Sequence, residues 1–296
     1  MFDVIVVGGG PAGLSAALML GRCRRKILLC DLGLPRNRRS HALHGYLTRD
    51  GVSPAELNAL GRSELAAYGI QCRQVGVTDA EWKTDRFHVT VGTTREEGRF
   101  LLLATGVVDD LPAVSGLEEC YGRSVFHCPY CDGWEWRDRA LAVLGRGREG
   151  TGTALALKTW SRDVVLCTNG SRLKTAERGR LARNEVAVRT TPISRLDHDD
   201  GRLSAVAFAN GDVLPRDALF FCTGQHPQSD LAVRLGCTLT RKGTVNTGNG
   251  CDTNVANVFV VGDASRDAQF VVVAAAEGVK AAVTINKALQ REELKP

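Results

Sequence analysis

Residues 4–13 read Val4-Ile5-Val6-Val7-Gly8-Gly9-Gly10-Pro11-Ala12-Gly13. The four β-branched residues at the start are typical of a short strand buried on both faces of a parallel sheet. The glycine-rich loop leads into an apolar helix over 14–20, and the segment 26–30 reads as a second parallel strand that ends before Asp31. The stretch therefore predicts a complete βαβ unit at the start of an α/β protein.

The three glycines Gly8, Gly10 and Gly13 have the spacing of a dinucleotide-binding loop. Their positions call for a tight turn, close approach of the backbone to a pyrophosphate and close helix–strand packing, and each excludes a Cβ. Asp31 follows at the end of the next strand, where a carboxylate can bond the hydroxyls of a ribose. A merely tight turn would leave Asp31 unexplained, so we predict a dinucleotide site here.

A second unit of the same kind lies in the middle of the chain. Strands are expected over 141–144 and 164–167, with Gly145, Gly147 and Gly150 in the loop between them. Each unit is followed by an apolar strand that ends in Thr-Gly, at 101–106 and at 219–224. We therefore predict an α/β protein with two Rossmann-like nucleotide-binding domains.

The closing stretch 258–263 and the Ala-rich segment 271–289 predict a strand and a helix without a glycine loop of their own. They most simply return to the first domain, so that the second domain is inserted in the first. Gly and polar residues gather near 112–116 and 242–248, which suggests the boundaries. We expect the first domain over 1–114 and 244–296, and an NAD(P)-type domain over 115–243.

The second glycine loop lacks the acidic strand end that accompanies the first. The next strand ends in Cys167-Thr168-Asn169-Gly170, which offers neither an acid for a ribose nor an arginine cluster for a 2′-phosphate. Arg146 and Arg148 could still meet phosphates. The loop is either an altered nucleotide site, formed by Gly145, Gly147 and Gly150, or a glycine turn kept for packing.

Two cysteines stand two residues apart in Cys128-Pro129-Tyr130-Cys131, and Asp132 follows directly. Such a pair can close a small disulfide ring, and its reactivity depends on how well the first thiolate is stabilised. Asp132 is placed to carry a proton. A zinc site is one competing interpretation, but zinc needs four ligands and the two cysteines with His127 supply three, so no metal is predicted. A pair of inert buried thiols is the other competing interpretation.

Several further residues have no single interpretation. The aromatic residues Tyr130, Trp134 and Trp136 could stack on a planar cofactor, form a docking surface or lie in the core. The histidines His41 and His44 could be surface residues, phosphate contacts or proton donors. Cysteines in apolar strand-like runs, namely Cys30, Cys167 and Cys222, are expected to be reduced core thiols.

Composition narrows the class of protein. A formal charge of +5 over 296 residues is modest, and no nucleic-acid partner is expected. The sequence starts directly in a strand, without the features of a signal peptide. No apolar run approaches the roughly 20 residues that span a bilayer. We expect a cytoplasmic protein that does not act at a membrane.

The chain resembles the small two-domain thioredoxin-reductase-like flavoproteins over essentially its entire length. The motifs that carry the resemblance are Gly8-Gly9-Gly10-Pro11-Ala12-Gly13, Ala104-Thr105-Gly106, Cys128 through Asp132, and Gly262-Asp263. The resemblance implies that the first domain binds FAD through these glycine-loop and strand-end residues and that Asp263 bonds the ribityl chain. It also implies a homodimer, with Cys131 as the flavin-proximal thiol and Cys128 as the exchanging thiol.

Two departures from that family bear on the direction of electron flow. Thioredoxin reductases that use NADPH carry His-Arg-Arg where this chain has Thr168-Asn169-Gly170, and Arg-Gln where it has Gln269-Phe270. The Cys-Pro-Tyr-Cys and Cys-Thr-Asn-Gly segments are more similar to a branch that contains dithiol oxidases of small molecules, and to one with a second flavin in place of the nicotinamide. In those branches electrons run from thiol to flavin.

We therefore expect an FAD-dependent dithiol–disulfide oxidoreductase that works in the dithiol-oxidising direction, without normal use of NADPH. Its substrate would be a small-molecule dithiol or a thioredoxin-like protein, and its second site would take NAD(P)H weakly or a second FAD. Two alternatives stay open. One is a thioredoxin reductase driven by NAD(P)H or ferredoxin, and the other is a non-catalytic flavin redox sensor whose disulfide state controls partner binding.

Overall fold

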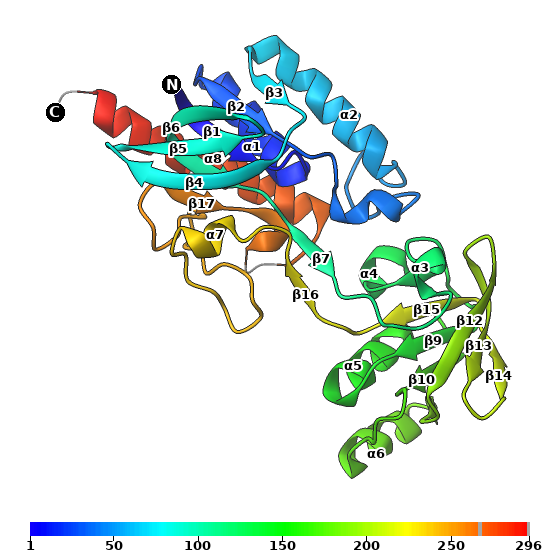
Figure 1. Cartoon of the computed structure of the whole chain (residues 1–296). Helices are drawn as coiled ribbons and strands as arrows, with labels where there is room; N and C mark the ends of the chain where they lie inside the picture. The colour runs from blue at the N-terminus through cyan, green and yellow to red at the C-terminus, as the bar shows by residue number, and fades with distance from the viewer. Residues whose placement is uncertain (266–267, 295–296) are drawn as a thin grey trace. The chain divides into compact units, whose positions relative to one another are not determined.

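The computed structural model of the chain describes residues 1–265 and 268–294 (Figure 1). The chain divides into two compact units, which are considered one at a time. Unit 1 comprises Met1–Arg38, Tyr46–Val108 and Gln225–Pro296, and unit 2 comprises Arg39–Gly45 and Asp109–Gly224. Within the described residues, no helix has both the length and the apolar character needed to cross a membrane.

Unit 1 is built on a seven-stranded sheet with helices packed against it. Its strands are β1 (Phe2–Val7), β2 (Ile27–Cys30), β3 (Gln71–Arg73), β4 (Val77–Lys83), β5 (Arg86–Val91), β6 (Thr94–Leu103) and β17 (Val258–Val260). Its helices are α1 (Pro11–Arg22), α2 (Pro54–Leu65), α7 (Leu231–Arg234) and α8 (Val271–Glu293), with short 3₁₀ helices η1 (Arg36–Arg39, which runs into unit 2), η2 (Ala66–Tyr68) and η3 (Gly262–Ala264).

The sheet of unit 1 has the strand order β3-β2-β1-β6-β5-β4, and β17 pairs with β6. The pairs of β1 with β2 and with β6 are parallel, as in the predicted βαβ unit. The strands β4, β5 and β6 pair antiparallel. Because β17 returns in parallel to β6 after the whole of unit 2, the second domain is inserted in the first, as predicted.

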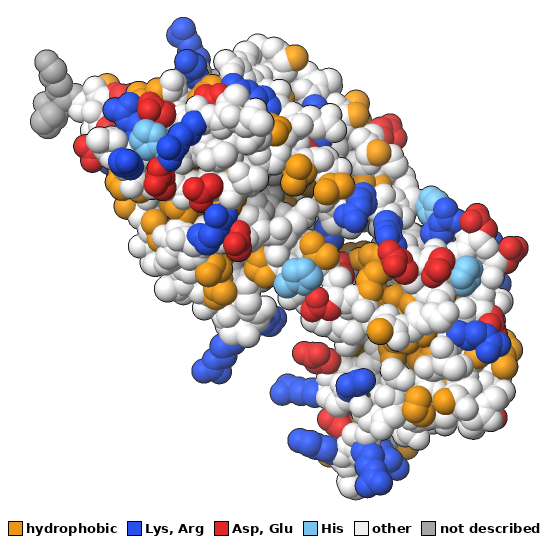
Figure 2. Space-filling model, in the orientation of Figure 1, with side chains coloured by type: hydrophobic (Ala, Val, Ile, Leu, Met, Phe, Trp, Pro, Cys, Tyr) orange, Lys and Arg blue, Asp and Glu red, His pale blue; other side chains and the backbone are white. Residues whose placement is uncertain are grey.

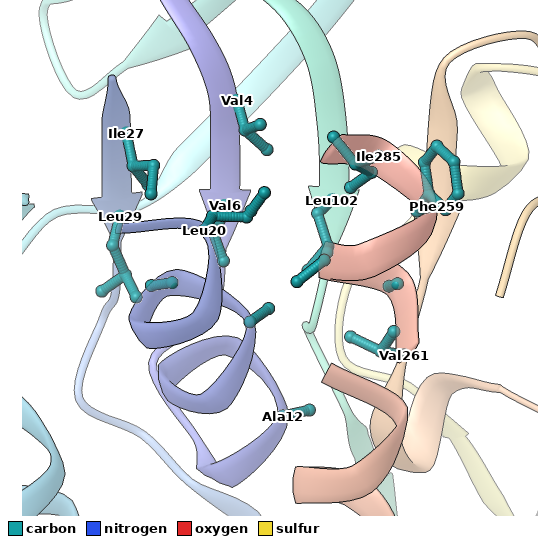
Figure 3. Close-up of a cluster of buried hydrophobic side chains, with 14 of the residues drawn as sticks. Val4, Val6, Ala12, Leu20, Ile27, Leu29, Leu102, Phe259, Val261 and Ile285 are labelled. Carbon is teal, nitrogen blue, oxygen red and sulfur yellow. The ribbon is translucent and has the colours of Figure 1, made fainter. Parts of the chain in front are cut away.

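The helices α1 and α8 share one apolar cluster with the sheet (Figure 3). Val6 and Leu102 project from the strands, Leu20 from α1 and Ile285 from α8, and all four are fully buried. Burying a side chain of this size contributes about 1.5–3 kcal/mol. This packing fixes α1, and with it the position of the glycine loop at its start.

Unit 2 has a second parallel sheet and a smaller antiparallel one. Its strands are β8 (Val125–Phe126), β9 (Leu141–Leu144), β10 (Val164–Cys167), β11 (Ala187–Arg189), β12 (Ile193–Asp199), β13 (Arg202–Phe208), β14 (Val213–Pro215) and β15 (Ala218–Phe221). Its helices are α3 (Leu117–Cys120), α4 (Pro129–Asp132), α5 (Gly147–Leu157) and α6 (Thr175–Arg183). The parallel sheet has the order β11-β10-β9-β15-β8, and β12, β13 and β14 pair in sequence. All residues of β9 and β10 are buried, which accounts for their continuous apolar sequences.

The chain passes between the units in β7 (Val107–Asp109) and β16 (Gln225–Pro227), which pair in a two-stranded sheet. The sequence suggested boundaries at 114/115 and 243/244, later than these crossings. Leu111 and Val114 already pack against the core of unit 2, whereas Leu231 and Cys237 pack in the core of unit 1. The domain boundary therefore follows the apolar contacts of these short segments, and it does not follow the Gly and polar residues that come later in the chain. The short segment Arg39–Gly45 of unit 2 had no sequence signal.

Candidate active site

The first glycine loop of unit 1 leaves a space above the start of α1. A Cβ on Gly8, whose φ is +108°, would collide with the Ala104 carbonyl oxygen, and one on Gly13 would collide with the Gly8 carbonyl oxygen. A Cβ on Gly10 would meet no atom within 4 Å among the described residues. Gly8 and Gly13 therefore serve close packing, and Gly10 borders the open side of the loop.

The start of α1 suits a phosphate group. Gly10 is the N-cap and Pro11 follows it, so the missing N–H of proline falls where no helical bond would form. In the described chain, no side chain caps this helix and no acidic residue lies in its first turn. Free backbone N–H groups and the positive end of the helix dipole favour an anion there. The pyrophosphate of a dinucleotide fits these features.

Asp31 directly follows β2, and its carboxylate lies beside the same loop. A Cβ on Gly9 would stand only 2.5–2.8 Å from the Asp31 side chain, so Gly9 must also be glycine, a requirement that the sequence reasoning missed. The Asp31 carboxylate pairs with Arg62 of α2. Its place at the strand end is the one predicted for a ribose contact.

Gly262 and Asp263 begin the short helix η3, next to the end of β17. The Gly262 N–H donates to Oε2 of the buried Glu277 at 2.6 Å, and Asp263 Oδ2 accepts from Arg36 Nη1 at 2.8 Å. Arg36 Nη1 also donates to Gln269 Oε1 at 2.7 Å. The sequence reasoning missed Arg36 and Glu277. A lone acid within the Ala-rich run before Gly278 was an available signal for Glu277.

The second glycine loop, in unit 2, has the same glycine spacing but a different backbone, because α5 starts at Gly147 itself, whose φ is +50°, whereas α1 starts after Gly10. A Cβ on Gly145 would lie 2.7 Å from Gly150 Cα, so these two glycines serve close packing. At Gly147 the nearest atom to a Cβ is Glu177 Oε1 at 3.8 Å, and Glu149 lies in the first turn of α5. Two carboxylates therefore stand close to where a phosphate would bind.

The end of β10 is occupied by contacts within the protein. The buried Thr168 donates its hydroxyl to the Ser171 carbonyl oxygen at 2.6 Å. Asn169 Oδ1 accepts from the Ile193 N–H at 2.8 Å. These side chains close the loop between β10 and the strands beside it, so they serve the fold where a nucleotide-binding enzyme would use the position for its ligand.

The two cysteines predicted as the redox pair lie at the start of α4. Cys128 and Cys131 are joined by a disulfide, with 5.3 Å between their Cα atoms. Cys128 is the N-cap of α4, and its Sγ accepts a hydrogen bond from the Cys131 N–H at 3.2 Å. When the disulfide opens, this donor favours negative charge on Cys128 Sγ. Both cysteines are partly exposed and accessible to another thiol.

The three aromatic residues near the disulfide have different environments. Tyr130 is 73% exposed and Trp134 is 63% exposed. Tyr130 makes an edge contact with Trp160, with 5.5 Å between ring centroids, and Arg137 stacks over the Trp134 ring at 4.3 Å. Trp136 instead packs against the core beside Phe126. Of these three side chains, Tyr130 and Trp134 therefore offer exposed apolar surface near the disulfide in the sequence.

Asp132 borders a cavity of about 600 Å³ within unit 2. Burial raises the pKa of the Asp132 carboxyl to about 7, and the negative charge of Glu135 contributes to this rise. A group with this pKa is present in both protonation states near neutral pH, as a proton carrier requires. The structure thus gives Asp132 a suitable environment for the predicted role.

The remaining cysteines in the described residues are free thiols. Burial raises the pKa of Cys30 to about 11 and that of Cys167 to about 12, and it also raises the pKa of Cys222. Such thiols stay protonated and unreactive at neutral pH. Among the described cysteines, Cys128 and Cys131 are the two that form a disulfide.

A dinucleotide cradle and a Cys-x-x-Cys disulfide in one chain define a class, the disulfide oxidoreductases that carry a dinucleotide cofactor. The family model of the pyridine nucleotide-disulphide oxidoreductases matches residues 2–278. The "Probable thioredoxin reductase" of Arthroderma benhamiae is 32% identical over 98% of this chain and 81% of its own length.

Solved structures agree with this assignment. TrxB from Bacillus anthracis superposes with a TM-score of 0.95 at 32% identity, covering 99% of this chain and 100% of that one. HlmI superposes with a TM-score of 0.94 at 36% identity, covering 99% of this chain and 93% of that one. The chain belongs to the pyridine nucleotide-disulphide oxidoreductase family, as a thioredoxin-reductase-like enzyme whose cofactor is FAD. The predicted fold class, family and cofactor are thereby confirmed.

Proposed function

We propose that this enzyme oxidises dithiols, passing their electrons through the Cys128–Cys131 disulfide to FAD, without normal use of NADPH. The observation that supports the dithiol-oxidising direction is the environment of the second glycine loop. Glu177 Oε1 stands 3.8 Å from a Cβ position on Gly147, and the end of β10 is taken up by Thr168 and Asn169. These features disfavour the phosphates and ribose of a nicotinamide dinucleotide.

The chain's own residues account for the thiol exchange. A substrate thiolate attacks Cys128 Sγ, which forms a mixed disulfide and releases Cys131 as the thiolate. The second thiolate of the same substrate then attacks the substrate sulfur that is bonded to Cys128. The oxidised substrate leaves with its new disulfide, and Cys128 is released as a thiolate. Asp132 takes up and returns the protons of these thiols. When bound, FAD supplies the two-electron acceptor that restores the disulfide, and oxygen or a quinone can serve as the final oxidant.

The residues assigned to FAD are those of unit 1. Gly8, Gly10, Pro11, Ala12 and Gly13 would hold the pyrophosphate, and Asp31 the ribose. The strand-end residues Ala104, Thr105 and Gly106 would line the same cradle, and Gly262 with Asp263 would bind the ribityl chain. The open space at Gly10 and the uncapped start of α1 support this assignment.

The direction is tested by following the oxidised-flavin absorbance of the purified enzyme without oxygen. We expect dithiothreitol to bleach the flavin, oxygen to restore the colour, and NADPH or NADH to leave it unchanged over the same time. Rapid bleaching by a nicotinamide nucleotide would overturn the proposed direction.

Cysteine variants test the route of the electrons. Cys128→Ser and Cys131→Ser should stay yellow but lose bleaching by dithiothreitol, because neither can form the disulfide. Cys72→Ser is the matched control, since Cys72 is an exposed free cysteine in unit 1. Retained bleaching in both single variants of the redox pair would refute this mechanism.

A thioredoxin reductase driven by NAD(P)H or ferredoxin is the second candidate. Basic side chains gather over α5 and α6 (Figure 2), among them Lys174, Arg178 and Arg180. They would attract a phosphorylated or acidic electron donor. Bleaching by nicotinamide nucleotide or by reduced ferredoxin, followed by reduction of a thioredoxin, would select this function.

The substrate class and assembly are also part of the proposal. The exposed Tyr130 and Trp134 beside the disulfide support an apolar small-molecule dithiol, while a thioredoxin-like protein is the alternative substrate. A homodimer in the cytoplasm is expected from the family resemblance. Sedimentation of the purified flavoprotein tests the assembly, and comparison of turnover with dithiothreitol and with a reduced thioredoxin tests the substrate class.

A further inference from the structure

The cavity beside Asp132 is also lined by two ionisable groups, Glu135 and His44, that have no part in the thiol exchange itself. Asp132, Glu135 and His44 all line this cavity of about 600 Å³. His44 Nε2 lies 3.5 Å from Glu135 Oε1. Glu135 lies shortly after α4 in the chain, and its charge acts on Asp132. His44 comes from the segment Arg39–Gly45, which belongs to the same unit.

We propose that Glu135 and His44 form the route by which Asp132 exchanges its proton with solvent. This inference rests on the proposed function, in which each oxidised dithiol delivers two protons at the disulfide. Among the described residues, the cavity lining includes Asp132 and neither Cys128 nor Cys131. In this proposal the proton leaves Asp132 through the cavity, whose lining does not include the two reacting cysteines.

The surroundings single out Glu135. Burial, and after it the charge of Glu135, disfavours the ionised form of Asp132. An ionised Asp132 therefore readily takes up a proton. A protonated Asp132 needs a nearby acceptor before it can lose that proton. Asp132 is partly buried, and the side chains of Glu135 and His44, which are 36% and 23% exposed, reach both the cavity and solvent. The cavity is large enough to hold water molecules between these groups.

Other charged groups face the same region. The cavity lining also contains His41, Arg123, Arg139, Asp199, Asp200 and Arg202. Arg123 and Asp200 pair with each other at 3.0 Å. On the other sides of α4, the helix α5 carries Arg148 and Glu149, and His127 pairs with Asp109 at 3.8 Å. Of all these groups, Glu135 is the one whose charge raises the pKa of Asp132.

The first experiment measures the protonation of Asp132 in the FAD-loaded enzyme. The infrared carbonyl band of protonated Asp132, identified by its loss in Asp132→Asn, is followed against pH. Glu135→Gln should lower the midpoint by roughly 0.5 to 1 pH unit, because a like charge is removed. Asp138→Asn is the matched control: it removes one negative charge outside the cavity, and its left-handed φ of 60° suits asparagine. An unchanged midpoint in Glu135→Gln would overturn the coupling.

The second experiment measures proton transfer during turnover of dithiothreitol with oxygen. Glu135→Ala and His44→Gln should slow turnover severalfold, and added imidazole should restore the rate in proportion to its concentration. Wild type and His41→Gln should show no such response, although His41 lines the same cavity. A loss that imidazole does not reverse would assign these residues a merely structural role. No turnover in wild type would refute the proposed function, while the infrared midpoint would still decide the coupling of Asp132 to Glu135.

Discussion

Glu177 holds its Oε1 atom 3.8 Å from the position that a Cβ on Gly147 would take. At Gly10, the equivalent glycine of the first loop, no described atom beyond its neighbours in the chain lies within 4 Å of such a Cβ. The two loops thus share the glycine spacing and differ in the charge beside it. A helix N-terminus attracts an anion, and a carboxylate already beside it opposes a second negative charge.

Glu177→Gln should therefore improve binding of NADPH to the second site. Removing the charge is expected to lower the dissociation constant about two- to fivefold. The capping contact survives, because a glutamine oxygen can still accept from the Lys174 N–H as Glu177 Oε2 does at 2.8 Å. Calorimetric titration of the flavoprotein with NADPH measures the change. The control is Glu118→Gln, on α3, which should leave the affinity unaltered, and equal affinities for wild type and Glu177→Gln would contradict the prediction.

Replacing two glycines of the first loop by alanine should separate cofactor binding from folding. Gly10→Ala places a methyl group in open space, on an extended backbone that any residue adopts, so the fold should persist while FAD is lost. Gly13→Ala drives a Cβ into the Gly8 carbonyl oxygen and should destabilise the protein by about 1–3 kcal/mol. Flavin content and the thermal midpoint of the apoproteins are the two measurements. Full flavin content in Gly10→Ala would show that the open space beside Gly10 is not the binding site of the FAD pyrophosphate.

Much of the fold was predictable because its strands are continuous apolar runs. The runs at 4–7, 141–144 and 164–167 became β1, β9 and β10, since only a strand covered on both faces suits such sequences. The return of β17 to the first sheet followed from its lack of a glycine loop. The passages between the units were harder, because they depend on where Leu111 and Leu231 are buried.

The candidate site was predictable only where local spacing carries the chemistry. Gly8, Gly10 and Gly13 and the Cys128–Cys131 pair are recognised from neighbouring residues alone. The contacts of His44 with Glu135 and of Arg36 with Asp263 join positions 91 and 227 residues apart. No local pattern reports such pairs, because they are created by the packing of the folded chain.

The crossing of α1 and α8 gives a test of the core. A Cβ on Gly278 would overlap the Ala12 carbonyl oxygen, so Gly278→Ala should force the helices apart and destabilise the protein by about 1–3 kcal/mol. Gly152→Ala is the matched control in α5, where a Cβ meets no described atom within 4 Å. That change should be neutral or stabilising by about 0.5–1 kcal/mol. Urea unfolding compares the free energies of unfolding of the two variants. A Gly278→Ala protein as stable as wild type would mean that close contact between α1 and α8 at Gly278 is not required.

The raised pKa of Asp132 should make stability depend on pH. Its pKa rises from 3.8 to about 7 in the folded protein, because of burial and then of Glu135. Between these values the folded state keeps a proton that the unfolded state has released, so the contribution of Asp132 is complete below about pH 4 and is lost as pH rises through about 7. Asp132→Asn is neutral at every pH and should remove this loss, which we expect to be on the order of 4 kcal/mol.

Thermal midpoints of the FAD-loaded enzyme between pH 4 and pH 8 measure this dependence. The midpoint of Asp132→Asn should gain on that of wild type by several degrees as pH rises across the window. Asp138→Asn should follow the wild-type curve, because Asp138 lies outside the cavity that Asp132 borders. Parallel curves for wild type and Asp132→Asn would mean that the carboxyl ionises in the folded protein as it does in the unfolded chain, and the proton carrier would then have to be sought elsewhere.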